Sequence, residues 1–343
     1  MDFTFLDLNL IWFVLIGVLF SGYAMLDGFD LGVGALHLLM KTDHERRVSI
    51  NSIGPVWDGN EVWLVTGGGA LFAAFPDVYA TLASGFYFAV MLLLMSLIFR
   101  AISIEFRSKH HSPAWRQFWD VSFSVSSIVA SLVLGIALGN LVMGIPLGPD
   151  KEYAGTFLGL FNPYALLVGV TTVALFMMHG AIYLCLKTEG EIHEKVRGWI
   201  NNCIIFFIIC YATTTMATLV YIPEMAEKFR LSPVLFLIPL VNMLAIANIP
   251  REIYHGRDLL ALLSSCVAMT ALIALFGVGI FPHIVLSNPL PEYSLTVYNA
   301  SGSQKSLNYM MNIAVIGIPF VLSYTVAIYW IFRGKVVLTA DSY

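Results

Sequence analysis

Two pairs of acidic residues lie inside stretches of sequence that are otherwise almost entirely apolar. Asp58 and Glu61 fall in segment 51–76, and Asp27 and Asp30 fall in the apolar stretch before it. Within each pair the acids are three residues apart, so on a helix they share one face. An ionised carboxylate at bilayer depth costs at least about 2.5 kcal/mol and usually marks an ion or proton route. These four acids form the predicted proton pathway, here called the acid ladder.

Helix geometry places the two pairs at different depths. At a rise of about 1.5 Å per residue, Asp27 and Asp30 lie about 15–20 Å from the cytoplasmic end of the first helix. The same arithmetic puts Asp58 and Glu61 about 4–10 Å deep in the second helix. If the two helices pack side by side, the carboxyl groups rise from the cytoplasm toward the middle of the membrane.

The third helix supplies a charge partner for these acids. Arg100 lies near its inner end, where a short-range ion pair would favour the ionised form of one carboxyl group. A structural interpretation stays open, because Asp27 or Asp30 could cap a broken helix and Arg100 could extend to the interface. Four acids on two helices favour the ion route over that alternative.

Composition indicates which class of protein holds these charges. Of 343 residues 58% are hydrophobic and 12% charged, with a mean hydropathy of +0.80, values that exclude an ordinary soluble domain. A membrane span takes about 20 apolar residues. Nine such spans are predicted, near 9–38, 56–75, 77–104, 116–141, 159–186, 198–221, 232–250, 258–281 and 307–332. We therefore expect an all-α polytopic membrane protein forming a single integral membrane domain over 1–343.

The basic residues predict the orientation of these spans. Fourteen of the 18 Lys and Arg residues fall in the C-terminal tail and in the loops after the first, third, fifth and seventh helices. Basic residues concentrate in cytoplasmic loops, so the N-terminus is expected outside and the C-terminus in the cytoplasm. Five tryptophans fall at the same side, as an aromatic belt should: Trp57, Trp115, Trp119, Trp199 and Trp330.

Several local patterns predict helix starts and contacts. Thr42 with Glu45, and Thr188 with Glu191, fit the spacing of a capping box at a helix N-terminus. Gly28 and Gly32 have the GxxxG spacing that lets helix backbones approach closely in lipid. Simple helix contact is favoured over ligand contact there.

Other function classes find little support. The net charge is −4 and no basic stripe with interleaved aromatics appears, which argues against nucleic acid as a partner. No cleavable signal peptide is expected, because the first basic residue is Lys41. No CxxC spacing occurs, so free thiols are expected rather than disulfides or a metal site. The cysteines are Cys185, Cys203, Cys210 and Cys266.

A haem site would need axial histidine or methionine ligands facing each other at matched depth. Of eight histidines only His179 falls well inside a predicted span, and methionine in apolar helices is usually packing. The chain is therefore expected to bind no haem iron of its own.

The chain resembles subunit II of the cytochrome bd family of quinol oxidases, including its cyanide-insensitive branch. The segments that carry the resemblance are GYAMLDGFDLGVGAL (22–36), ERRVSINSIGPVWDGNEVWLVTGGGALFAAFP (45–76) and YATLASGFYFAVMLLLMSLIFR (79–100). Looser matches, such as Trp119-Asp120, extend it over the whole chain.

This resemblance implies two four-helix bundles, about 9–141 and 159–281, and a peripheral helix at 307–332. It implies a subunit I that holds two b-type haems and haem d, in the bacterial cytoplasmic (inner) membrane. The complex would oxidise quinol and reduce dioxygen to water with cytoplasmic protons, without pumping. Asp58 occupies the WDGN position implicated in proton supply, whereas some relatives carry Gln in place of Glu61. Membrane lipids, a structural quinone and small accessory subunits are further partners that the resemblance allows.

Two competing interpretations remain. Buried acids and Gly-rich helices also suit a secondary transporter, although transporters often show interrupted helices in both halves and these acids all fall in the first hundred residues. The chain could also be a scaffold subunit with no proton role. Helices around Trp63 and Phe88 could line a dioxygen path, but packing explains them equally well.

Overall fold

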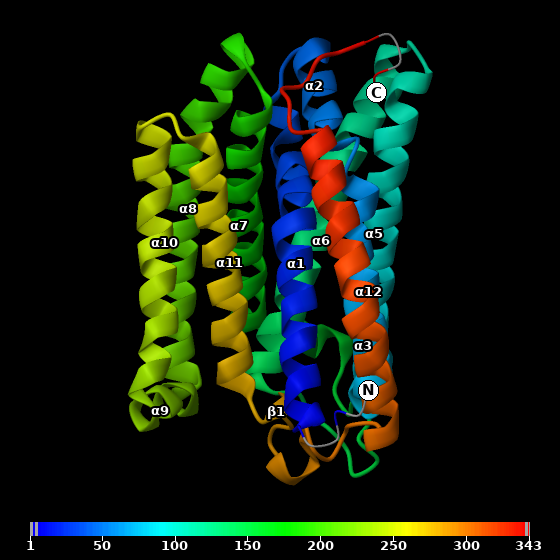
Figure 1. Ribbon diagram of the computed structural model, residues 1–343, viewed down its shortest axis with the longest axis vertical. Coiled ribbons are helices and arrows are strands. Elements are labelled where there is room, and N and C mark those ends of the chain that lie inside the picture. Colours follow the sequence, from blue (N-terminus) through cyan, green and yellow to red (C-terminus); the bar gives the residue numbers. More distant parts are fainter. Residues whose placement is uncertain (1–2, 4–5, 340–341, 343) are drawn as a thin grey trace.

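The computed structural model describes residues 3, 6–339 and 342 of the chain (Figure 1). Long helices stand side by side along one axis, and the two chain ends lie at opposite ends of the molecule. The helices are α1 (Leu8–Leu36), α2 (Asp43–Ile53), α3 (Trp57–Ala74), α4 (Pro76–Gly85), α5 (Tyr87–Phe106), α6 (Pro113–Met143), α7 (Pro163–Lys187), α8 (Gly190–Tyr221), α9 (Pro223–Leu231), α10 (Leu237–Tyr254), α11 (Asp258–Ile280) and α12 (Gln304–Ile331). Strands β1 (His283–Val285) and β2 (Leu295–Thr296) pair antiparallel at the end where the chain begins.

Eight of the nine predicted spans are confirmed as helices long and apolar enough to cross a membrane. In the described part of the chain they cover Leu8–Leu39, Tyr87–Lys109, Pro113–Met143, Pro163–Lys187, Gly190–Tyr221, Pro233–Tyr254, Asp258–Ile280 and Gln304–Ile331. The ninth, α3, has 18 residues but is less apolar, because Asp58, Asn60 and Glu61 occupy its first turns. The span predicted at 77–104 is divided, since its first residues form α4 and the chain breaks at Phe86 before α5.

Helix α1 lies at the centre of the fold, in contact with α3, α6, α7, α11 and α12 (Figure 1). It meets α7 where glycines of both helices face each other. A Cβ added to Gly32 would lie 1.8 Å from the Phe176 carbonyl oxygen, and one added to Gly180 would lie 2.4 Å from the Gly32 carbonyl carbon. The two backbones touch directly, which only glycine at both positions allows. This contact lies directly after Asp30 and fixes the part of α1 that carries the acids.

The two predicted capping boxes had different outcomes. At α2 the Thr42 hydroxyl accepts from the Glu45 N–H and the Glu45 carboxylate accepts from the Thr42 N–H, which confirms the first. The second prediction was wrong. Helix α8 begins after Glu189 without a side-chain cap, and the Thr188 hydroxyl donates instead to the Leu184 carbonyl at the end of α7. The Thr188 hydroxyl therefore binds the last turn of α7 and does not cap α8.

Candidate functional site

Two of the four predicted acids pair with one buried arginine, and a third lies close by. Arg100 reaches from α5 into the bundle and is completely buried. Its Nη1 lies 2.6 Å from Oδ1 of Asp27 on α1, and its Nη2 lies 3.0 Å from Oε2 of Glu61 on α3. Arg100 therefore forms ion pairs with two of the acids that the sequence analysis named, and it joins three helices.

The third acid of this group, Asp30, is held by a neutral side chain. Asn60 on α3 donates through Nδ2 to Oδ2 of Asp30 at 2.8 Å, and its Oδ1 accepts from the Tyr329 hydroxyl of α12 at 2.8 Å. The sequence interpretation missed Asn60 and Tyr329, because an uncharged residue in an apolar helix carries no charge pattern. We call Asp27, Asp30, Glu61 and Arg100 the Arg100 cluster.

Charge in the Arg100 cluster is not balanced. Asp27, Asp30 and Arg100 are fully buried and the Glu61 side chain is 24% exposed, so three carboxyl groups share one guanidinium. Within the described residues, Asp27 Oδ2 and Asp30 Oδ1 have no hydrogen-bond partner. An uncompensated buried charge costs several kcal/mol, so charge balance favours protons on some of these carboxyl groups. The arrangement can hold and exchange protons.

Asp58 does not join this cluster. It lies one turn before Glu61 on α3, with its side chain exposed, and it makes no hydrogen bond or ion pair within the described residues. The same helix has open space at Gly59, Gly68 and Gly69, where an added Cβ would meet nothing within 4 Å. The outward face of α3 therefore combines a carboxylate with a smooth surface.

A second buried ion cluster lies near the end of the molecule that carries α2. Oδ1 of Asp120, on α6, accepts from His37 Nε2 at 2.7 Å and from Arg107 Nε at 2.5 Å. Its Oδ2 accepts from Arg46 Nη1 at 2.8 Å and from Arg107 Nη2 at 3.3 Å. Arg107 also contacts Asp43 at 2.9 Å. Sequence reasoning gave Asp120 no role, although an acid in an apolar helix with arginines in the neighbouring loops was a usable signal.

Comparison with known proteins places the chain in a family. A model of the family described as cytochrome bd terminal oxidase subunit II matches residues 8–332. The chain belongs to that family. It is 36% identical over 360 residues to "Cytochrome bd-I ubiquinol oxidase subunit 2" of Escherichia coli K12, covering 96% of this chain and 95% of the relative. It is 34% identical over 334 residues to "Cytochrome bd ubiquinol oxidase subunit 2" of Bacillus subtilis 168, covering 96% and 97%.

The fold agrees with this assignment to subunit II. A chain from "The structure of bd oxidase from Geobacillus thermodenitrificans" superposes with a TM-score of 0.79 at 15% identity, over 95% of this chain and 99% of that one. Together with eight apolar helices, membership of this subunit II family makes the chain a multi-pass protein of the bacterial inner membrane and part of a terminal oxidase. The predicted family is confirmed.

Cytochromes contain haem, and the two fully buried histidines of this subunit II, His37 and His179, are the candidate iron ligands. His179 Nδ1 lies 2.6 Å from the Ser265 hydroxyl and its Nε2 lies 2.9 Å from the Met25 carbonyl oxygen. His37 uses both ring nitrogens as well, toward Ser49 and Asp120. Neither imidazole offers a free lone pair, so these residues do not fit an axial site for haem.

Proposed function

We propose that this chain is the subunit of a quinol oxidase that holds a haem-bearing subunit I and supplies it with cytoplasmic protons. The Escherichia coli and Bacillus subtilis relatives are named ubiquinol oxidase subunits, which supports this reaction class. In the complex, two quinol molecules would each give two electrons and release two protons. The four electrons, with four protons taken from the cytoplasm, would reduce one dioxygen to two water molecules. Two b-type haems and haem d belong to subunit I in this proposal, and the complex is electrogenic without pumping.

The observation that carries the proton role is the charge imbalance of the Arg100 cluster. Glu61 connects the buried cluster to the surface of α3. Its Oε2 contacts Arg100, while part of its side chain remains exposed beside Asp58. A proton arriving at Asp58 has Glu61 one helical turn away. Arg100 keeps its own proton but holds Glu61 and Asp27 at the same guanidinium. The orphaned oxygens of Asp27 and Asp30 are the proposed acceptors beyond Glu61. The order Asp58, Glu61, Asp27, Asp30 is the proposed route.

Subunit I is proposed to dock on the outward faces of α3 and α5. Large apolar side chains are exposed there, on α3 at Val62, Val65 and Phe72 and on α5 at Phe88, Met91 and Met95. Lipid could cover these side chains, but it would also meet the exposed carboxylate of Asp58, which is unfavourable for a charge. A protein partner with polar groups removes that cost, and Gly69 allows its backbone to approach closely.

Helix α3 is proposed as the ninth span, which gives the topology that the sequence predicted. Its 18 residues extend about 27 Å. It packs against α1 and α12, and the partner would cover its polar turns. The end that carries α2 and the C-terminal tail is rich in basic residues, which supports a cytoplasmic C-terminus and an external N-terminus. Contacts of α10 with α11 and of α7 with α8 support a second four-helix bundle, with α12 peripheral.

An apolar groove of about 660 Å³ between α1, α10 and α11 is a proposed place for a structural quinone or a lipid tail. Met25, Val241, Leu263 and Val267 are among the side chains that line it. Such a lining suits an isoprenoid or acyl chain, because it offers dispersion contacts and few hydrogen bonds.

Proton supply is tested with the assembled complex in liposomes. Asp27→Asn keeps a hydrogen-bond acceptor for Arg100 but removes an exchangeable proton. We expect normal haem content, slower oxygen consumption, and slower alkalinisation on the side facing the α2 end. Asp77→Asn is the matched control, because Asp77 pairs with Lys151 on the exposed surface at the other end. Equal rates in both variants would refute the proton role.

Docking is tested by a pair of glycine variants. Gly69 on α3 and Gly317 on α12 both have open space around an added Cβ. If subunit I covers α3, Gly69→Leu lowers the yield of copurified subunit I, whereas Gly317→Leu leaves it unchanged. Equal yields from both variants would place the partner elsewhere.

A further inference from the structure

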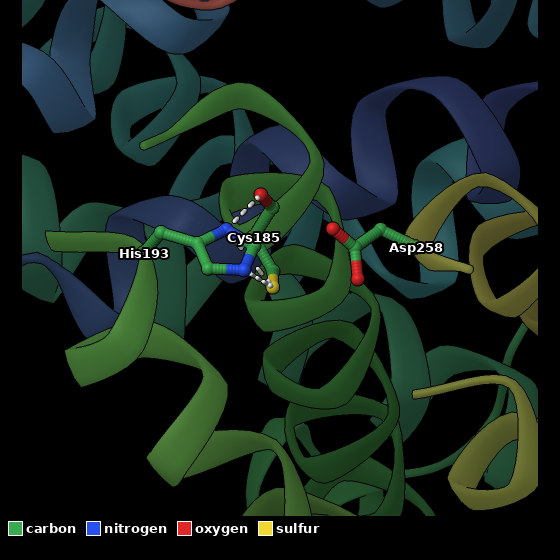
Figure 2. A group of neighbouring side chains, drawn as sticks. All are labelled: Cys185, His193 and Asp258. Carbon is green, nitrogen blue, oxygen red and sulfur yellow. Dashed lines mark hydrogen bonds between the residues drawn. The ribbon is translucent and has the colours of Figure 1, made fainter. Parts of the chain in front are cut away.

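Three potential metal ligands from three helices meet at the end of the molecule that carries α2 (Figure 2). Cys185 lies in the last turn of α7, His193 near the start of α8, and Asp258 is the first residue of α11. Their ligand atoms all lie within 4.8 Å of one another. Cys185 is fully buried and the other two are partly buried. No disulfide engages this cysteine, which is a free thiol.

The orientation of His193 is the one that metal-bound histidines adopt. Its Nδ1 lies 3.0 Å from the carbonyl oxygen of Cys185, and its Nε2 lies 3.8 Å from Cys185 Sγ (Figure 2). When Nδ1–H donates to that carbonyl, the lone pair of the ring is on Nε2, which is then free for a metal ion. Fixing the tautomer through the second ring nitrogen is the usual support for an imidazole ligand.

The sulfur and the imidazole are close enough to share a zinc ion once the ring turns. With Zn–S near 2.3 Å and Zn–N near 2.0–2.1 Å, tetrahedral geometry separates sulfur and nitrogen by about 3.6 Å. Cys185 Sγ lies 3.8 Å from His193 Nε2 but 3.6 Å from Nδ1, so the sulfur lies beside the ring and not in line with the Nε2 lone pair. Zinc binding therefore requires a rotation of the imidazole about its side-chain bonds. Asp258 supplies the second independent observation, because its buried Oδ1 has no hydrogen-bond partner within the described residues. Figure 2 shows the Asp258 carboxyl group on the side of the sulfur opposite the imidazole.

We propose that Cys185, His193 and Asp258 bind a zinc ion, with water in the fourth position. One thiolate, one neutral imidazole and one carboxylate suit zinc better than magnesium or calcium, which prefer oxygen ligands. The two negative ligands balance the charge of the ion. That balance matters because Lys335 lies close by, with Nζ 3.4 Å from the Cys185 carbonyl oxygen, and would repel a site of net positive charge.

The role of the ion is structural. It ties the turn between α7 and α8 to the start of α11, which the sequence connects only through α8, α9 and α10. The C-terminal segment closes over this place, since the Val336 N–H donates to the Lys187 carbonyl at 2.9 Å. The sequence led us to expect no metal site at the cysteines, because Cys185 has no CxxC partner and Asp258 lies on a distant helix. None of its residues belongs to the Arg100 cluster, so the site is independent of the proposed proton role.

Zinc content of the purified oxidase complex tests the proposal. The complex is stripped with a chelator, titrated with Zn²⁺ alone and passed through a desalting column before metal analysis. We expect about one zinc per copy of this chain, retained at micromolar free zinc. Losing a supporting second-shell group typically costs 10–100-fold in metal affinity, so Cys185→Ser and His193→Asn should each lose about 100-fold or more. Cys266→Ser is the control, because this cysteine lies outside the cluster.

Two further measurements keep the outcome decisive. Co²⁺ should give a thiolate-to-cobalt absorption band in wild type and in Cys266→Ser, and no such band in Cys185→Ser. Zn²⁺ should raise the thermal unfolding midpoint of wild type but not of Asp258→Asn. Equal zinc content in wild type and Cys185→Ser, or no retained zinc in wild type, would overturn the proposal. Asp27→Asn should bind zinc normally, which separates this test from that of the proton route.

Discussion

The two buried ion clusters of this subunit combine the same kinds of groups in opposite proportions. Around Asp120, one carboxylate receives hydrogen bonds from two arginines and His37, and each of its oxygens has two donors. Around Arg100, one guanidinium pairs with two carboxylates, a third carboxyl group is bound by Asn60, and two carboxyl oxygens have no partner in the described part of the chain. Both clusters are buried, so burial alone does not distinguish them.

The difference separates a fixed charge from an exchangeable one. A carboxylate whose oxygens are all engaged by cations stays ionised and holds its neighbours rigidly. A carboxyl group with a free oxygen beside like charges can take up a proton with little rearrangement, because the proton relieves repulsion. This difference supports the proposal that the Asp120 cluster stabilises the fold and the Arg100 cluster handles protons.

The largest expected effect comes from Asp120→Asn. This change leaves the buried Arg107 with only the half-exposed Asp43 as counter-charge and turns an amide N–H₂ group toward donors. Breaking a buried pair in this way costs about 3–5 kcal/mol, so we expect little assembled complex. Haem-containing complex recovered from membranes is the measurement. Asp43→Asn is the control, because Asp43 contacts the same arginine but is about half exposed (46%). Equal recovery of the two variants would contradict the structural role of Asp120.

Arg100→Met is expected to destabilise less than Asp120→Asn, by about 1–3 kcal/mol, although it too removes a buried charge. The reason is that the three remaining carboxyl groups can become neutral by taking up protons, whereas arginines cannot lose theirs. Thermal unfolding of the two purified complexes ranks them. A larger loss of thermal stability in Arg100→Met than in Asp120→Asn would contradict the proposed difference between the two clusters.

Asp58→Asn tests the outer end of the proposed route. We expect the complex to assemble with full haem content and its turnover to fall about tenfold, which corresponds to about 1.4 kcal/mol in the barrier. Oxygen consumption with saturating quinol measures it, with Asp77→Asn as control. Unchanged turnover in Asp58→Asn would limit this chain to a scaffold role.

The ion pair between Glu45 and Lys195 is partly exposed, so its loss should have the smallest effect of these substitutions. Burial opposes ionisation of Glu45, but hydrogen bonds from Lys195 at 2.7 Å and from the N–H groups of Lys41 and Thr42 outweigh it and lower the pKa of Glu45. A lowered folded-state pKa stabilises the fold above the unfolded pKa of about 4.3, and that stability is lost as pH falls through the folded value.

Glu45→Gln should therefore cost less than about 1 kcal/mol at pH 7, and the difference from wild type should shrink below about pH 4. Unfolding midpoints across this pH range are the measurement. Glu191→Gln, at the uncapped start of α8, should show no such difference. A cost for Glu45→Gln that stays constant down to low pH would show that charge is not its source.

Much of the Arg100 cluster could be predicted from the sequence, because charge in an apolar helix is rare and spacing fixes its face. Asp27, Asp30, Glu61 and Arg100 were found in this way. Asn60 and Tyr329 were not, since a neutral amide and a phenol are common in spans and their role depends on which helices touch.

Features that depend on contacts between distant helices were also missed. The Asp120 cluster joins α6 to the ends of α1, α2 and α5, and the proposed zinc ligands come from α7, α8 and α11. Eight spans could be predicted from apolar length alone, whereas the break at Phe86 depends on how the chain packs.

The pairing of Asp27 with Arg100 also has a consequence for biosynthesis. The two residues are 73 positions apart in the chain. At about 5–20 residues per second, Asp27 leaves the ribosome about 4–15 s before Arg100 does. During that interval α1 must enter the membrane without its cation, so its acids have to be protonated or shielded until α5 arrives. On this view the newly made helix takes up a proton long before the finished oxidase consumes one.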